Sequence, residues 1–246
     1  CSRDWSSDVC SSDLAGSGIG LATTRRLAEE GCDVTGGILD ESQRTALSGM
    51  PAEVLDVRNA AQWEKAIGAV LARRGRLDIL VHCAGISRPG TAQETSQETW
   101  DEVIGINLTS ILLGSRTALP HLRKVRGTIV SVASINAIRG NTGMAAYVAS
   151  KFGVAGLTQS MAMDYATEGV RVNCVCPGAI ETPMMKDALG RAADPDAAHA
   201  ATLAKHPMGR MGRAEEIAST IAFLASDDAS FITGVALPVD GGRSAR

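Results

Sequence analysis

Short apolar runs alternate with longer amphipathic segments along most of the chain. The apolar runs predict strands at Val34–Ile38, Glu53–Val57, Leu77–His82, Gly127–Ala133, Val170–Cys176 and Val235–Val239. The segments between them predict helices at Gly18–Glu30, Ala60–Arg74, Gln97–Leu122, Met144–Glu168 and Ala214–Ser226. This alternation is typical of an α/β fold built on a single Rossmann-type, doubly wound parallel sheet with helices on both faces.

One interval, residues 180–212, interrupts the alternation. It carries Pro183, Pro195 and Pro207 and has no clean strand pattern. We expect it to form one or two short helices in a mobile insertion. Beside the end of a strand, such a segment can serve as a lid over a cleft.

Composition favours one domain with an aliphatic core. The chain has 246 residues, of which 45% are hydrophobic but only 3% aromatic, so Ala, Val, Ile and Leu must fill the core. An α/β chain of this length commonly folds around a single sheet. No internal repeat or low-complexity linker indicates a second domain.

Charge and targeting signals exclude several classes of partner. The formal net charge is −3, and no basic run indicates a nucleic-acid surface. No apolar stretch is long enough for a membrane span, and no secretion signal is evident, so we expect a soluble cytoplasmic protein. The six cysteines include no C-x-x-C pair. Cys174 and Cys176 would share one face of a strand, and we interpret them as small buried side chains, with no metal site.

A glycine-rich turn precedes the first predicted helix. It consists of Gly16, Ser17, Gly18, Ile19 and Gly20. Glycines at such a turn let backbone approach a pyrophosphate, and the helix N-terminus offers unpaired N–H groups to the phosphates. By itself the pattern also fits an ordinary tight turn.

A phenol and an amine lie one helical turn apart at Tyr147 and Lys151. Residues four apart on a helix share a face. Because a free tyrosine titrates near pH ~10, a nearby ammonium would help it exchange a proton at neutral pH. An exposed Tyr and Lys on a helix surface would give the same pattern. Ser134, however, follows a predicted strand at the edge of the sheet where ligands bind, and it can hydrogen-bond a substrate oxygen.

Taken together, these motifs resemble those of the classical short-chain dehydrogenase/reductase family. The likeness covers roughly residues 15–242 and rests on the glycine-rich turn, Cys83-Ala84-Gly85, Asn107, Ser134, Tyr147, Lys151 and Pro177-Gly178, in order. The resemblance implies that Tyr147 is the general acid/base and that Lys151 holds the nicotinamide ribose and lowers the Tyr147 pKa. It implies that Ser134 polarises the carbonyl. It also implies that Asn107 bends its helix and holds a water that relays protons.

The resemblance also assigns the dinucleotide contacts. Asp56 and Val57 would lie against the adenine, and Cys83, Ala84 and Gly85 beside the adenine ribose. The nicotinamide would be framed by Pro177, Gly178, Ile180 and Thr182. His82 replaces an Asn common in the family, and we interpret it as structural. Members of the family are usually homotetramers or homodimers.

Residues 1–14 depart from the family pattern, which begins with an apolar strand and a Thr-Gly pair. Asp13 and Leu14 stand where the pair is expected, and the stretch holds three Asp, one Arg and five Ser. Buried charges in a central strand are costly without partners. The repeated Ser-Ser-Asp at 6–8 and 11–13 is similar to translated sequencing-adaptor sequence. We interpret residues 1–14 as an atypical leader that has overwritten the first strand, ahead of an oxidoreductase domain at 15–246, and expect impaired cofactor binding.

Function and cofactor choice follow from the same residues. We expect an NAD(P)-dependent enzyme that interconverts an alcohol and a ketone on a small hydroxy or oxo compound. A non-catalytic dinucleotide sensor of the same fold is the alternative, although such proteins typically lack the Tyr or Lys. NAD is favoured over NADP because no Arg or Lys lies in Ala15–Gly20 or just after Ile38 to hold a 2′-phosphate. Asp40, rather than the residue at the strand end, is the nearby acid.

Overall fold

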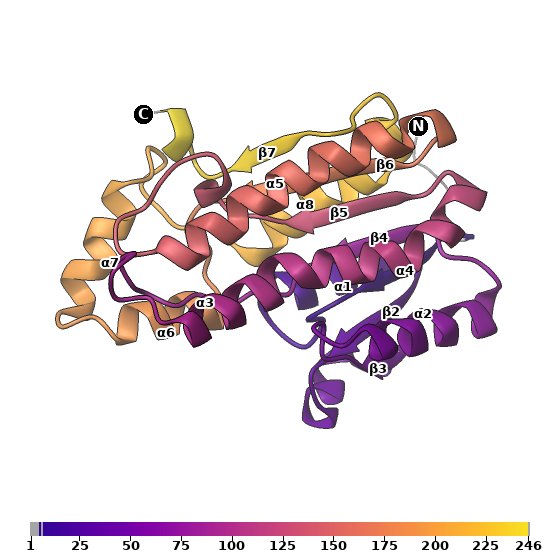
Figure 1. The fold of residues 1–246 in the computed structure, drawn as a ribbon, viewed down its shortest axis with the longest axis horizontal. Helices are drawn as coiled ribbons and strands as arrows, with labels where there is room; N and C mark the ends of the chain where they lie inside the picture. Colours follow the sequence, from indigo (N-terminus) through magenta and orange to yellow (C-terminus); the bar gives the residue numbers. More distant parts are fainter. Residues whose placement is uncertain (1–4, 6, 246) are drawn as a thin grey trace.

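A single parallel sheet lies between two layers of helices in the computed structural model, which describes residue 5 and residues 7–245 (Figure 1). The strands are β1 (Val9–Ser12), β2 (Asp33–Ile38), β3 (Ala52–Val54), β4 (Ile79–His82), β5 (Thr128–Val132), β6 (Arg171–Pro177) and β7 (Ala236–Val239). Their order is β3-β2-β1-β4-β5-β6-β7, and every neighbouring pair is parallel. The expected doubly wound fold is confirmed.

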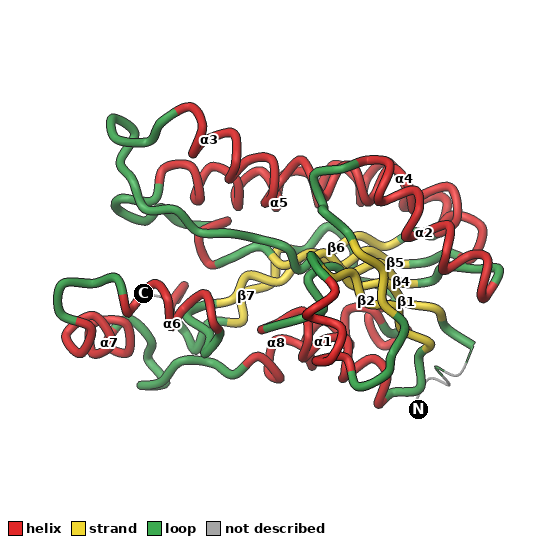
Figure 2. The backbone as a smooth tube through the Cα atoms, turned by 90° about the horizontal axis from the view of Figure 1, so that it is seen from below, coloured by secondary structure: helices red, strands yellow, loops and turns green. Residues whose placement is uncertain are grey.

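Helices cover both faces of the sheet. They are α1 (Gly18–Glu29), α2 (Ala60–Arg74), α3 (Gln97–Ile104), α4 (Ser110–Val125), α5 (Ala145–Tyr165), α6 (Pro183–Gly190), α7 (Pro195–Ala204) and α8 (Ala214–Ala225). Figure 2 shows α2, α4 and α5 on one face and α1 and α8 on the other. The interval 180–212 contains α6 and α7, as the prolines predict.

Strand side chains alternate between two aliphatic core layers. Leu80 packs with Trp63 of α2 in one layer, while Ile79 and Val81 pack with Ile217 of α8 in the other. Successive residues of a strand point to opposite faces, and a sheet covered on both faces therefore needs apolar residues at every position. This explains the apolar run Ile79–Val81 in β4.

The first strand differs from the expectation. No strand is predicted before the glycine-rich turn, yet β1 lies at the centre of the sheet, between β2 and β4. Backbone pairing with both neighbours holds Val9–Ser12 in place, and such pairing does not depend on side-chain type. Cys10 and Ser12 are fully buried there. Strand β3 is also shorter than predicted, because it ends at Val54 rather than Val57.

The long helix predicted over 97–122 is interrupted. A π-helical turn at Gly105–Thr109 separates α3 from α4, and it carries the fully buried Asn107. Such turns insert one extra residue into the helix and are frequent at functional sites. Here the turn directs Asn107 toward α5, as its contacts below establish.

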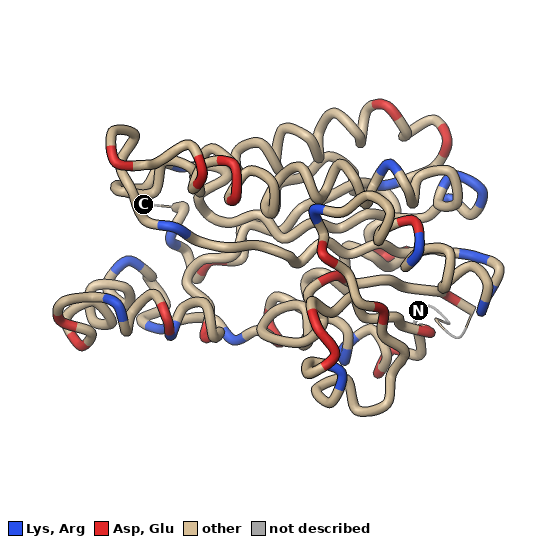
Figure 3. Tube along the Cα trace, turned by 60° about the horizontal axis from the view of Figure 1, so that its bottom comes forward, with Lys and Arg blue, Asp and Glu red and all other residues tan. Residues whose placement is uncertain are grey.

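Charged residues of both signs are dispersed over the described chain, and Figure 3 shows no gathering of Lys and Arg on the side in view. None of the helices in the described residues is long and apolar enough to cross a membrane. All strands run in the same direction, so their carboxyl ends share one edge. The strand order reverses between β1 and β4, and ligands of doubly wound sheets bind beside such a reversal.

Candidate active site

Ser134, Tyr147 and Lys151 come together beyond the carboxyl end of β5. Ser134 follows the strand and begins the short 3₁₀ turn Ile135–Ala137, where its Oγ accepts a hydrogen bond of 3.1 Å from the Asn136 N–H. Tyr147 lies in the first turn of α5, close enough to Ser134 that the serine side chain lowers the Tyr147 pKa. The Lys151 Nζ lies 5.8 Å from the centre of the Tyr147 ring. The phenol and the ammonium thus face each other, as the four-residue spacing predicts.

Lys151 is buried, with its ammonium hydrogen-bonded to backbone and close to Gly85. Its side chain is 3% exposed, and its Nζ donates a hydrogen bond of 2.9 Å to the Val132 carbonyl. A Cβ added to Gly85 would lie 3.4 Å from this Nζ and 3.5 Å from Asn107 Oδ1. Gly85 therefore allows its own backbone, Lys151 and Asn107 to meet at one point.

Asn107 ties that point to its surroundings. Its Oδ1 accepts a hydrogen bond of 2.8 Å from the Ile86 N–H, and its Nδ2 donates to the Ile86 carbonyl and to Ser150 Oγ, both at 3.0 Å. The Asn107 side-chain amide is thus hydrogen-bonded to the chain after β4 and to α5. The role of Asn107 in a water relay stays a prediction.

Burial dominates the electrostatics of the pair. It lowers the pKa of Lys151 from 10.5 to about 8. Burial also raises the pKa of Tyr147, and the nearby Ser134 side chain opposes this rise. The effect of Lys151 on the Tyr147 pKa stays a prediction, because desolvation of the phenolate is the larger effect in the protein alone.

The glycine-rich turn fits a dinucleotide pyrophosphate. A Cβ on Gly20 would lie 2.1 Å from the Leu14 carbonyl oxygen, and Gly18 has a φ of +52°. Neither position tolerates a side chain without strain. Ser17 precedes α1 without capping it through its side chain, and the first turn of α1 contains no acidic residue. The N–H groups of this helix end are therefore offered to an anion, as phosphate binding requires.

Other predicted dinucleotide contacts follow β6 and β3 at the same edge of the sheet. Ile180 is buried after β6, and Thr182 caps α6 by accepting a hydrogen bond from the Met185 N–H at 3.3 Å. The Thr182 methyl group lies 3.5 Å from the position of a Cβ on Gly18, so the segment after β6 faces the glycine-rich turn. Val57 packs in the core, and Asp56 forms an ion pair with Arg58 at 2.8 Å.

Sequence reasoning missed Asp13, which it took for a misplaced charge. The carboxylate is 1% exposed and accepts hydrogen bonds from the Cys83 N–H and, at 2.7 Å, from the Ala84 N–H. Its other oxygen lies 3.2 Å from His82 Nδ1. Asp13 therefore fixes the turn after β4. The sequence signal was its place three residues before Gly16 of the glycine-rich turn, where the family pattern has Thr.

His82 fills space between α2 and α4. Its Nε2 lies 3.2 Å from Ser115 Oγ, and its ring packs edge-to-face against Trp63 at 5.4 Å. A Cβ on Gly114 would lie 2.6 Å from the imidazole, so glycine makes room for it. These contacts agree with a structural role for His82.

Comparison with known proteins gives the family. A sequence model described as enoyl-(acyl carrier protein) reductase matches residues 14–244. The chain is 39% identical over 243 residues to the 3-oxoacyl-(acyl-carrier-protein) reductase FabG of Thermotoga maritima, covering 95% of this chain and 96% of the relative. It is 42% identical over 240 residues to cis-4-hydroxycyclohexanecarboxylate dehydrogenase of Sinomonas cyclohexanicum, covering 94% of each.

Solved structures agree with the sequence comparison. Aldohexose dehydrogenase of Thermoplasma acidophilum in ligand-free form superposes with a TM-score of 0.91 at 35% identity, covering 97% of this chain and 94% of that one. The arrangement of helices and strands is thus shared with a solved relative. The chain belongs to the classical short-chain dehydrogenase/reductase family and is an NAD(P)-dependent oxidoreductase acting on CH–OH groups.

Proposed function

We propose that the protein interconverts an alcohol and a ketone on a small hydroxy or oxo compound, with Tyr147 as general acid/base. The observation that carries the proposal is the placement of Tyr147 beside Ser134 and the buried Lys151. A phenol aimed at a hydroxyl group at a sheet edge can move a proton to or from a substrate oxygen.

In the reduction, the Ser134 hydroxyl donates a hydrogen bond to the substrate carbonyl oxygen and polarises it. Tyr147 then gives its phenolic proton to that oxygen, and in the oxidation it takes the proton back. A nicotinamide held at this site would supply or accept the hydride. Lys151 would bind the nicotinamide ribose, and its ammonium would oppose the rise that burial causes in the Tyr147 pKa. Asn107 would hold the relay water beside Lys151.

The dinucleotide would lie along the carboxyl edge of β1, β4 and β6. Its contacts would be Gly16, Ser17, Gly18, Ile19, Gly20, Asp56, Val57, Cys83, Ala84, Gly85, Tyr147, Lys151, Pro177, Gly178, Ile180 and Thr182. NAD is proposed as the preferred cofactor. Asp40 stands two residues after the buried Ile38 and is exposed, so its carboxylate would repel a 2′-phosphate.

The proposed substrates are those whose oxygen can reach Ser134 and Tyr147: a 3-hydroxy acid, a 3-oxoacyl thioester or a sugar. The names of the relatives support this range, since they include a 3-oxoacyl-(acyl-carrier-protein) reductase, a hydroxycyclohexanecarboxylate dehydrogenase and an aldohexose dehydrogenase. All of these substrates carry a hydroxyl or oxo group on carbon.

A homotetramer or homodimer is proposed as the assembly. Large apolar side chains stand exposed on α4 and α5: Leu112 is 46% exposed, Phe152 46% and Met163 82%. Apolar groups grouped on neighbouring helices are typical of surfaces that another subunit covers.

The function is tested by following absorbance at ~340 nm with NADH or NADPH and a panel of small ketones and 3-oxoacyl compounds. We expect oxidation of the reduced cofactor with at least one compound, faster with NADH than with NADPH. Tight binding of either cofactor with no turnover of any compound would instead support the dinucleotide sensor.

A further inference from the structure

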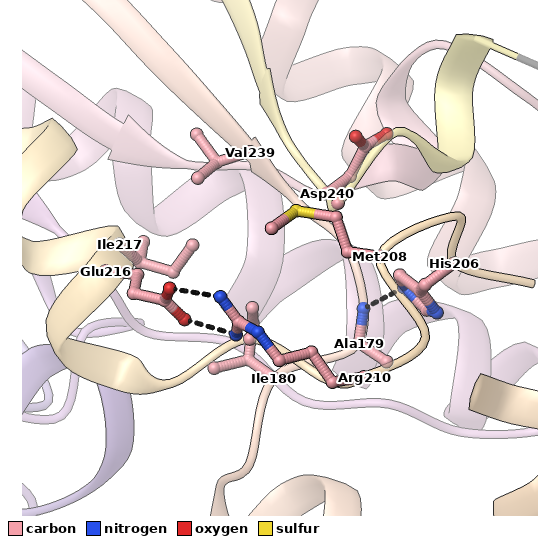
Figure 4. Close-up of a pocket in the computed structure, with 11 residues that line it drawn as sticks. Ala179, Ile180, His206, Met208, Arg210, Glu216, Ile217, Val239 and Asp240 are labelled. Carbon is pink, nitrogen blue, oxygen red and sulfur yellow. Dashed lines mark hydrogen bonds and ion pairs between the residues drawn. The ribbon is translucent and has the colours of Figure 1, made fainter.

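His206 joins the segment before α8 to the chain that follows β6 (Figure 4). Its side chain is 3% exposed. The ring Nε2 accepts a hydrogen bond of 3.0 Å from the Ala179 N–H, and Nδ1 lies 2.8 Å from the Thr202 carbonyl of α7. A backbone N–H can only donate, so Nε2 carries the lone pair and Nδ1 the proton. Both ring nitrogens are therefore used, one toward α7 and one toward Ala179.

The backbone on either side of Ala179 is fixed from the same segment. Gly212 N–H donates to the Ala179 carbonyl at 2.9 Å, and the Glu181 N–H donates to the Gly212 carbonyl at 2.9 Å. A Cβ on Gly178 would lie 2.8 Å from His206 Nε2, so the glycine lets the imidazole approach the chain. Ala179 thus has its N–H held by a side chain and its carbonyl held by backbone.

Packing alone does not hold this stretch. A cavity of ≈ 140 Å³ lies beside it, lined in part by Ala179, Ile180, His206 and Met208. Figure 4 shows the imidazole at one end of this cavity and the Arg210–Glu216 ion pair near Ile180. Space of this size gives the chain after β6 room to shift when a specific contact is lost. On the side of the cavity, the Ala179 N–H is held by its hydrogen bond to the His206 imidazole.

We propose that His206 is a positioning residue for the nicotinamide half of the dinucleotide site. By fixing the Ala179 amide, it sets where Ile180 and Thr182 stand one and three residues later. This inference rests on the proposed function, in which those two residues frame the nicotinamide. The segment between α7 and α8, which the sequence pattern predicts to be part of a lid, thereby gains a role in positioning the nicotinamide.

The test compares two ligands that differ in the nicotinamide. Isothermal titration calorimetry would measure NADH and ADP-ribose, which lacks the nicotinamide, on the wild type, His206→Leu and His206→Gln. NADPH and 2′-phospho-ADP-ribose replace them if NADPH binds the wild type more tightly. His199→Leu, an exposed histidine on α7, is the matched control.

His206→Leu should weaken NADH binding about tenfold, equivalent to about 1.4 kcal/mol, and leave ADP-ribose within about twofold of the wild type. His206→Gln places an amide oxygen where it can accept from Ala179 and should recover most of the loss. Equal weakening of both ligands, no weakening in His206→Leu, or no recovery in His206→Gln would overturn the inference. Wild-type protein that binds ADP-ribose but neither NADH nor NADPH would contradict the proposed function itself.

Discussion

Replacing Lys151 with methionine should stabilise the fold while removing the activity. Burial lowers the pKa of Lys151 from 10.5 to about 8. One pKa unit corresponds to about 1.4 kcal/mol, so holding the ammonium inside the folded protein costs about 3 kcal/mol. Methionine fills a similar volume without a charge. The Val132 carbonyl, however, loses a donor at 2.9 Å, which costs about 1 kcal/mol.

The net gain at neutral pH is therefore about 2 kcal/mol, or roughly 5 °C in melting temperature for a chain of this size. The sign of the pH dependence follows from the depressed pKa. Below about pH 8 Lys151 is charged in the folded and the unfolded state, so the penalty is fully present. As pH rises from about 8 toward 10.5, the folded state becomes neutral while the unfolded state stays charged, and the penalty disappears.

Urea unfolding between about pH 7 and about pH 10 would measure this difference. The advantage of Lys151→Met over the wild type should shrink as the pH rises, because the wild type loses the penalty of its buried ammonium and the variant has none to lose. Lys65→Met, an exposed lysine on α2, is the control and should match the wild type within about 0.5 kcal/mol at every pH. A difference between Lys151→Met and the wild type that stays constant with pH would refute the reasoning.

Two further changes test the glycine-rich turn and the first strand. Gly20→Ala places its Cβ 2.1 Å from the Leu14 carbonyl oxygen, so it should abolish dinucleotide binding and destabilise the fold by about 2 kcal/mol. Gly68→Ala, in open space on α2, is the control and should stabilise the fold by about 0.5–1 kcal/mol. Thermal unfolding and calorimetric titration would measure both variants. Equal stability and equal dinucleotide affinity of Gly20→Ala and Gly68→Ala would contradict this account. An apolar first strand ending in Thr-Gly should raise melting temperature and dinucleotide affinity, because Leu14 has a φ of +48° that favours glycine. If neither rises, residues 1–14 have not overwritten a better strand.

The sheet and most helices could be predicted because their signals are local. The apolar run of β4 predicts a strand and the amphipathic pattern of α2 predicts a helix, each from neighbouring residues alone. Helix α2 begins and ends at the predicted residues. The Tyr147–Lys151 spacing fixes a shared helix face in the same way. The position of Ser134 at a strand end then brought it to the same edge of the sheet.

The features that escaped prediction depend on contacts between distant segments. β1 is held by its two neighbours in the sheet rather than by its composition. Asp13 became useful only because the Cys83 and Ala84 N–H groups meet it across the sheet. The sequence around His206 has no regular pattern and gives no sign of a partner, and the fold brings His206 to Ala179. Such partners cannot be read from residue type or spacing.

Hydride transfer in Tyr147→Phe tests the central claim most directly. Phenylalanine keeps the ring but removes the hydroxyl beside Ser134. NADH should still bind the variant, because the other proposed contacts remain, while the turnover number for ketone reduction should fall about a thousandfold because the proton donor is lost. Turnover by Tyr147→Phe within about tenfold of the wild type would contradict the assignment of Tyr147 as the general acid/base.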